Sequence, residues 1–294
     1  MTEKSHREPF DFAYSGRTFI GSTNDYDLAS AVIYGMPMDW TTSFRAGARL
    51  GPQRIREVSI GLEEYSPYLD RHLEAAAYFD IGDIPLPFGH AGRSLELIER
   101  YVGRWLDDGK LPMGLGGEHL VTLGAIRAAA NRIPDLKIIH IDAHADLRDE
   151  YEGEALSHSA VIKQAAHLLK PENIYQFGVR SGTREEFAYA RAYTNFYPYE
   201  VLNPLRKVAA ALGDAPVYVT IDIDVLDPAF APGTGTAEAG GITSREMIES
   251  IHVMQGLNVV GFDLVEVAPV LDPTERTQIV AAKIVREALL TFAI

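Results

Sequence analysis

The chain contains no cysteine, and this absence excludes three kinds of chemistry. Without thiols there can be no disulfide framework, no thiolate nucleophile and no cysteine-ligated zinc site. Long apolar runs are also missing, because none approaches the roughly 18 residues of a membrane-spanning helix. Residues 1–16 carry charges but no apolar segment of signal-peptide length. We therefore expect a cytoplasmic protein with no membrane partner.

Positive charge is scarce as well. The chain has 27 Lys and Arg residues against 41 Asp and Glu residues, which gives a net charge of −14 at pH 7. This excess of acid disfavours nucleic acid and anionic membranes as partners and attracts small cations. Many proteins have an acidic surface without a special ligand, so the charge alone identifies no function.

The chain has no Pro/Ser-rich linker, internal repeat or low-complexity segment. Its length of 294 residues, 47% of them hydrophobic, is enough for one large core. We therefore predict a polar N-terminal lead-in over residues 1–30 and a single catalytic domain over residues 31–294.

Short apolar runs alternate with helical patterns along this domain. Strands are predicted at residues 31–35, 77–81, 111–115, 137–142, 173–179, 217–223 and 259–264. Helices are predicted from residue 51, from an N-cap at Ser94 to Gly109, at 121–130, from Ser157, and at 183–193, 204–212, 244–257 and 274–292. Continuous apolar strands that alternate with helices are typical of an α/β fold, with a mostly parallel sheet and helices on both faces.

Acids and imidazoles follow several of these strands. From residue 140 to 146, polar and apolar residues alternate, and a period of two places the polar ones on one face. Because ligands bind at the C-terminal ends of parallel strands, we expect the side chains that follow them to converge. This set is His119, Asp142, His144, Asp146, Asp222, Asp224 and Glu266.

Burying several unpaired acids would cost several kcal/mol each, so cations are expected among them. The predicted metal ligands are His119, Asp142, His144, Asp146, Asp222 and Asp224. An oxygen-rich set without sulfur favours manganese over zinc, and two divalent ions would balance four carboxylates. Such a pair also lowers the pKa of a shared water and supplies a hydroxide nucleophile. Taken alone, the stretch 142–146 could instead be a hydrogen-bonded loop terminus.

Four sequence blocks, in this order, resemble the signature motifs of the ureohydrolases, the arginase and agmatinase family. They are Gly-Gly-Glu-His at 116–119, Asp-Ala-His-Ala-Asp at 142–146, the block 222–228 running into Pro-Gly-Thr-Gly-Thr at 232–236, and the block 263–269. The resemblance covers about residue 34 to the C-terminus and is greatest to bacterial agmatinases. It implies a three-layer α/β/α arginase-like fold with an eight-stranded, mostly parallel sheet, and a homo-oligomer, either a trimer or a hexamer.

The resemblance also implies the roles of single residues. Two Mn²⁺ ions per subunit would be held by His119 and Asp146 on one ion and by His144 and Asp224 on the other, with Asp142 and Asp222 bridging. Metal-bound hydroxide would attack a guanidinium carbon, with Asp146 steadying the intermediate. Glu266 would grip the guanidinium, and His158 would protonate the leaving amine. Ser159 departs from the family pattern, which usually has Gly after this histidine, and His140 has no role in the family.

The identity of the guanidine substrate rests on fewer residues. Arginases hold the amino-acid head of arginine with an Asn and an Asp, and Arg148 and Ser181 stand at those places. Loss of the Asp removes the partner of an α-ammonium, which favours agmatine. Acids in the loop 149–154, such as Glu152, could receive the second ammonium of agmatine, whereas Arg148 would suit the carboxylate tail of guanidinobutyrate.

We therefore predict an agmatinase, a hydrolase of linear amidines that releases urea and putrescine for polyamine biosynthesis. Guanidinobutyrase and arginase are the nearest alternatives. A catalytically inactive regulatory subunit would be expected to have lost a ligand, and all six are present. A metal-dependent deacetylase on a related fold would be expected to hold a single zinc ion, so metal stoichiometry distinguishes it.

Overall fold

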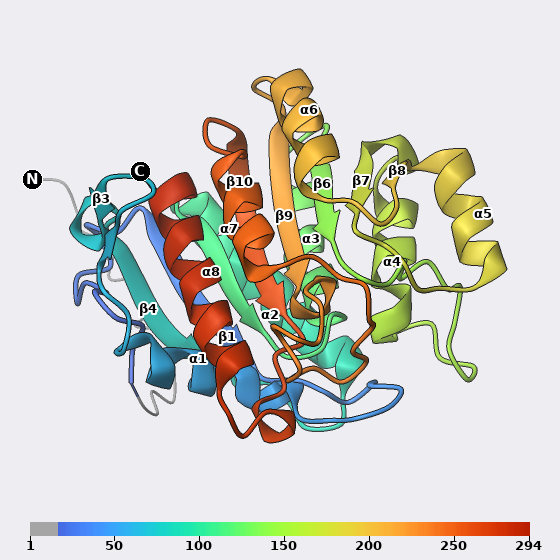
Figure 1. The fold of residues 1–294 in the computed structure, drawn as a ribbon, viewed down its shortest axis with the longest axis horizontal. Coiled ribbons are helices and arrows are strands. Elements are labelled where there is room, and N and C mark those ends of the chain that lie inside the picture. The colour runs from blue at the N-terminus through green and yellow to red at the C-terminus, as the bar shows by residue number, and fades with distance from the viewer. Residues whose placement is uncertain (1–16) are drawn as a thin grey trace, which may run out of the picture.

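The structure is a computed structural model that describes residues 17–294, so the predicted lead-in lies outside the described residues as far as Gly16. The strands of the main sheet are β1 (Ala31–Met36), β4 (Tyr78–Asp83), β5 (Leu111–Gly116), β6 (Lys137–Ile141), β7 (Ile174–Phe177), β8 (Asn195–Tyr197), β9 (Pro216–Asp222) and β10 (Asn258–Val265). They form one eight-stranded sheet in the order β4-β1-β5-β10-β9-β6-β7-β8, and every pair is parallel (Figure 1). The short strands β2 (Tyr65–Ser66) and β3 (Arg71–His72) make a separate antiparallel pair.

Helices cover both faces of the sheet. One layer contains α1 (Gly51–Ser59), α6 (Leu202–Leu212), α7 (Ser244–His252) and α8 (Arg276–Phe292), and the other contains α2 (Ala91–Asp107), α3 (Val121–Ala130), α4 (Val161–Leu168) and α5 (Arg184–Tyr193). In Figure 1, α6, α7 and α8 lie in front of the sheet, with α3 and α4 behind it. Each layer closes its own apolar core, built around Ile55 and Leu289 on one face and around Trp105 and Ile126 on the other. The predicted three-layer α/β/α fold is confirmed.

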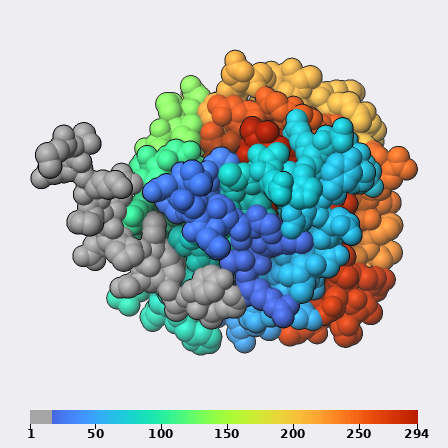
Figure 2. All heavy atoms as spheres, turned by 90° about the vertical axis from the view of Figure 1, so that its left-hand side faces the viewer, coloured from blue at the N-terminus to red at the C-terminus, as the bar shows by residue number. Residues whose placement is uncertain are grey.

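An early part of the described chain meets the C-terminal helix α8 beside the edge strand β4. Seen from that side, early segments, coloured blue to cyan, lie against the red C-terminal helix (Figure 2). The Ser66 hydroxyl donates a hydrogen bond of 2.8 Å to Glu287 Oε2, and Arg71 donates one of 2.8 Å to the Leu290 carbonyl. No helix within residues 17–294 is both long and apolar enough to cross a membrane.

Several predicted boundaries were wrong, and each error has a local cause. Helix α2 begins at Ala91, three residues before the predicted cap, and the Ser94 hydroxyl donates to the His90 carbonyl from inside the first turn. Helix α7 ends at His252, because residues 253–257 turn and Gly256 adopts a φ of 90°. The helix predicted from Ser157 starts as a single 3-10 turn, His158–Ala160, before α4.

The sheet order places four strands side by side at its centre, β5, β10, β9 and β6. His119, Glu266 and Asp142 follow β5, β10 and β6, respectively, and Asp222 is the last residue of β9. Because all four run in the same direction, their C-terminal ends lie at one edge of the sheet.

Candidate functional site

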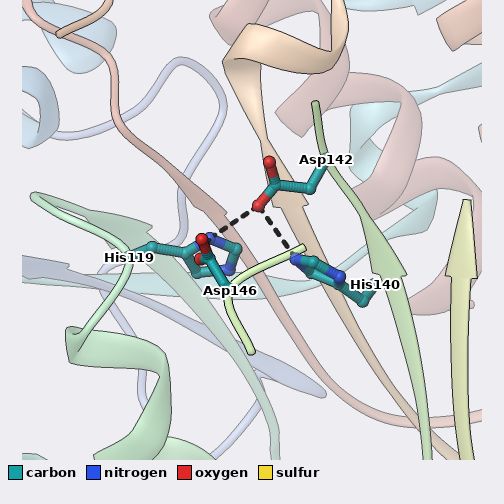
Figure 3. A group of neighbouring side chains, drawn as sticks. All are labelled: His119, His140, Asp142 and Asp146. Carbon is teal, nitrogen blue, oxygen red and sulfur yellow. Dashed lines mark hydrogen bonds and ion pairs between the residues drawn. The ribbon is translucent and has the colours of Figure 1, made fainter. Parts of the chain in front are cut away.

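Imidazole and carboxylate groups meet at the C-terminal edge of the central strands. His119 Nδ1 lies 3.0 Å from Asp142 Oδ2, 3.2 Å from Asp146 Oδ2 and 3.5 Å from Asp222 Oδ2. Figure 3 shows His119, Asp142 and Asp146 turned toward one another from different segments. The side chains of His119, Asp142, Asp146 and Asp222 are all buried.

A second group adjoins the first and shares Asp142 with it. His144 Nδ1 lies 3.0 Å from Asp224 Oδ2 and 3.6 Å from Asp142 Oδ1. Asp142 therefore lies between two imidazoles, with one carboxylate oxygen toward His119 and the other toward His144. The six residues predicted to be metal ligands thus lie together, in two groups around a common carboxylate.

The donor atoms of this site fit divalent cations. His119 Nδ1 and Asp224 Oδ2 are buried, yet neither has a hydrogen-bond partner within residues 17–294. A buried polar atom without a hydrogen bond costs free energy of folding. Carboxylate and imidazole groups lie within a few ångströms of both atoms but do not form hydrogen bonds with them. Burial, reinforced by the nearby charges of Asp224 and Asp142, raises the pKa of Asp222 well above its ordinary range. A cation among these oxygens would remove that repulsion.

The side chains that follow β6 are oriented by the backbone of a loop and not by a continued strand. Strand β6 ends at Ile141, so the alternation expected through residue 146 holds only for its first residues. Beyond it, the backbone N–H of His144 donates to Asp142 Oδ1 at 2.5 Å, and that of Ala143 donates to Asp224 Oδ1 at 3.2 Å. Asp146 adopts a φ of 52°, in the left-handed region that few non-glycine residues occupy.

His158 and Glu266 lie beside the ligand cluster. His158 Nδ1 is 3.2 Å from Glu266 Oε1, an oxygen that also accepts a hydrogen bond of 2.9 Å from the His119 N–H. Burial opposes protonation of His158, but the hydrogen bond to Glu266 and other nearby carboxylates outweigh it and raise the pKa of His158 to about 8. The departure at Ser159 therefore does not move His158 away from the site.

Comparison with known proteins identifies the family. The sequence profile of the Arginase family matches residues 29–291. This chain belongs to the arginase family. It is 61% identical to an agmatinase of Bacillus anthracis over 96% of this chain and 98% of that protein. It is 35% identical to a guanidinobutyrase of Pseudomonas aeruginosa, over 92% and 88% of the two chains. The solved agmatine ureohydrolase of Thermoplasma volcanium is 31% identical, with a TM-score of 0.84 over 95% of each chain.

In this arginase-family chain, a cavity of about 300 Å³ opens onto the ligand cluster. Its wall includes Ser43, His119, His144, Asp146, Arg148, Tyr151, His158, Ser181, Thr183, Glu186, Asp222 and Thr236. Arg148 and Ser181, which were predicted to contact the substrate tail, therefore both line this cavity. Glu152 is exposed and is not among the lining residues, since it lies at the tip of a turn closed by hydrogen bonds between Tyr151 and Glu154.

The wall contains a carboxylate that the sequence did not single out. Glu186 is buried, and it accepts hydrogen bonds from the backbone N–H groups of Leu147 (3.1 Å) and Thr183 (2.8 Å). Arg148 Nε lies 3.7 Å from Glu186 Oε2, and the Arg148 guanidinium lies over the Tyr151 ring. Arg148 is thus already beside an acid. The Thr-x-x-Glu pattern at 183–186 could have indicated only a capping box for α5, which the structure contains.

Glu118 is a second carboxylate without a predicted role. It is fully buried, and its Oε2 accepts a hydrogen bond of 2.8 Å from the Thr41 N–H. The Thr41 hydroxyl in turn accepts one of 3.1 Å from the His158 N–H. Burial and the neighbouring Glu266 raise the pKa of Glu118 to about 8. Glu118 and Thr41 together link the strand end before His119 to the backbone of His158.

Proposed function

We propose that this protein is an agmatinase, which hydrolyses a guanidino C–N bond of agmatine to release urea and putrescine. The observation that carries the proposal is the pairing of two kinds of acidic site in one cavity. A buried cluster of His and Asp ligands lies at its base, and the separate buried carboxylate of Glu186 lies in its wall. The high identity to an agmatinase over nearly the whole chain supports the same substrate.

We propose two Mn²⁺ ions per subunit as the cofactor, because the ligand set is rich in oxygen and contains no sulfur. His119 and Asp146 would hold one ion and His144 and Asp224 the other, with Asp142 and Asp222 bridging. When bound, the pair would lower the pKa of a shared water, so that hydroxide is available near neutral pH.

The chain's own residues would bind the guanidinium and move the protons. Glu266 uses its Oε1 for the His119 N–H and for His158, and its other oxygen, Oε2, would accept N–H groups of a guanidinium. Asp146, at the cavity wall, would accept a hydrogen bond from the attacking water. His158, held by Glu266, would give a proton to the departing amine.

The tail of the substrate would lie toward Glu186. Agmatine carries an ammonium at that end, which a buried carboxylate would pair with, whereas guanidinobutyrate would bring a second carboxylate to the same place. Arg148, which would suit a carboxylate tail, already lies beside Glu186 and over Tyr151, so an ammonium would share the Glu186 carboxylate with it. Ser181 gives an α-ammonium no charged partner, so arginine is disfavoured. Glu186 replaces Glu152 as the proposed anchor of the tail.

A side-by-side assay of urea release from agmatine, guanidinobutyrate and arginine by the manganese-loaded protein tests the proposal. We expect agmatine to exceed both by at least about tenfold in kcat/KM, a difference of about 1.4 kcal/mol that one charged contact supplies. Glu186→Gln should reduce this preference, because Gln removes the charge while its single oxygen can still accept the Thr183 N–H of the helix cap. Glu185→Gln, one residue away and exposed, is the matched control and should not. Faster hydrolysis of guanidinobutyrate would contradict the assignment.

The cellular setting is part of the same proposal. We propose a cytoplasmic homo-oligomer, a trimer or a hexamer, acting in polyamine biosynthesis. Sedimentation analysis of the purified protein tests the oligomeric state independently of the activity.

A further inference from the structure

Polar side chains form a row across the sheet, at the level just below the ligand cluster. His140 of β6 is in register with Thr220 of β9 on one side and with Gln176 of β7 on the other, and all three are fully buried. Two of them contact predicted ligands. Thr220 Oγ1 lies 2.9 Å from His119 Nε2, and His140 Nε2 lies 2.8 Å from Asp142 Oδ2 (Figure 3). Buried polar groups are almost always hydrogen-bonded, so the partners of these three side chains indicate what they do.

His140 is close enough to His119, Asp142 and Asp146 to be a metal ligand itself. A ligand must offer a lone pair, because a ring nitrogen that carries hydrogen cannot bind a cation. The position of the hydrogen on the His140 ring therefore decides between a ligand and a supporting residue.

Gln176 fixes that hydrogen. Its side-chain nitrogen lies 2.9 Å from the Ala145 carbonyl oxygen, which can only accept, so this amide end is the donor. The same nitrogen lies 3.2 Å from His140 Nδ1. The amide oxygen, at the other end, accepts a hydrogen bond of 3.1 Å from the Thr194 hydroxyl. His140 Nδ1 is therefore the acceptor of a Gln176 hydrogen bond.

The remaining ring nitrogen then has a single role. A neutral imidazole has one acceptor nitrogen and one N–H donor. Because Nδ1 accepts from Gln176, Nε2 carries the hydrogen and donates it to Asp142 Oδ2. The His140 ring has no lone pair left for a cation.

We infer that His140, oriented by Gln176, is a positioning residue that holds Asp142 in the orientation needed to bridge two metal ions. The inference rests on the proposed binuclear site. Thr220 has the corresponding position behind His119, which is proposed to bind one ion only. The two residues should therefore differ in their effect on metal affinity. Loss of His140 should weaken the binding of both ions, and loss of Thr220 should weaken the binding of one.

Manganese titration of the substrate-free protein tests this difference. We expect His140→Phe to raise both dissociation constants by about 10- to 100-fold, the usual effect of losing a partner behind a metal ligand. His140→Gln keeps an N–H donor and should recover part of the affinity. Thr220→Val, the matched control, should raise only one constant. Unchanged constants in His140→Phe, or complete loss of one ion with the other unaffected, would overturn the inference.

A spectroscopic test does not require a folded His140→Phe variant. In metal-free protein labelled with ¹⁵N histidine, long-range proton–nitrogen correlation should give His140 as the tautomer with hydrogen on Nε2. Gln176→Glu, which replaces the amide donor by an acceptor, should place hydrogen on Nδ1, where the wild-type ring has none. A wild-type tautomer with hydrogen on Nδ1 would refute the inference.

Neither measurement contains a substrate, so each is independent of the agmatine assay. If agmatine is not hydrolysed while the titrations follow expectation, the proposed substrate is wrong and the positioning role stands. If agmatine is hydrolysed and the titrations fail, only the positioning role is lost.

Discussion

Two buried clusters of charge in this protein differ in whether the chain completes them. Arg56 of α1 donates to both oxygens of Asp80, to Asp83 at 2.6 Å and to the Gly82 carbonyl, and Asp80 also accepts the Phe19 N–H. The ligand cluster has carboxylates and imidazoles but no Arg or Lys within its two groups, and buried atoms of His119 and Asp224 have no hydrogen-bond partner within residues 17–294. The first cluster therefore needs nothing further, whereas the second requires a cation.

The largest expected effect follows from removing the shared carboxylate. Asp142→Ala should lose both manganese ions and bring activity below detection, because Asp142 lies between both groups. His119→Ala should weaken mainly one ion and retain some activity at high manganese concentration. Metal analysis of the reconstituted proteins should give two ions per wild-type chain. One tightly bound zinc per chain with full activity would contradict the binuclear site.

His158→Asn separates proton transfer from metal binding. Turnover should fall by about 10²- to 10⁴-fold while metal content stays near two per chain. Since the pKa of His158 is raised to about 8, its neutral form is present only as the pH rises through that value. A proton donor must be protonated, so the part of the wild-type rate that depends on His158 should fall as the pH rises through that value. A variant with unchanged turnover would leave His158 with a structural role alone.

Changes to the cluster around Arg56, whose charges are paired within the chain, should affect stability and not metal binding. Arg56→Met leaves the buried Asp80 and the partly exposed Asp83 without their cation, so the free energy of unfolding should fall by about 3–5 kcal/mol, mostly through Asp80. The same loss is expected with and without manganese, and metal stoichiometry should not change. Arg54→Met, on the more exposed side of α1, should cost less than about 1 kcal/mol. A loss seen only in the metal-loaded protein would show that the two clusters are coupled.

The position of a site residue was predictable from the sequence where that residue lies at or just after the end of a strand. His119, Asp142 and Asp222 each come within a few residues of a buried apolar strand, so the parallel sheet alone predicts that they meet. The same reasoning predicted the sheet and its helical layers, because the long strands are mostly apolar and alternate with helical patterns.

Residues whose position depends on long-range packing were not predictable. Glu186 points into the cavity because α5 packs beside the loop after β6, and its capping-box pattern indicates only a helix start. Glu152 was chosen because its loop is rich in acids, but composition does not specify side-chain direction, and its turn points it to solvent. The edge strand β8 was missed because its residues are only half-buried.

The order of the strands has a consequence for how the protein acquires its metal. His119 and Asp224 are separated by about a hundred residues, and the ligands they represent meet only after β9 has inserted between β10 and β6. Parallel pairings of this range form late, since their loop-closure entropy must be overcome first. A chain that has emerged only as far as β6 would contain His119 alone of the six proposed ligands. Tight metal binding therefore reports a completed sheet, and manganese should stabilise the native state by mass action without recruiting partly folded chains.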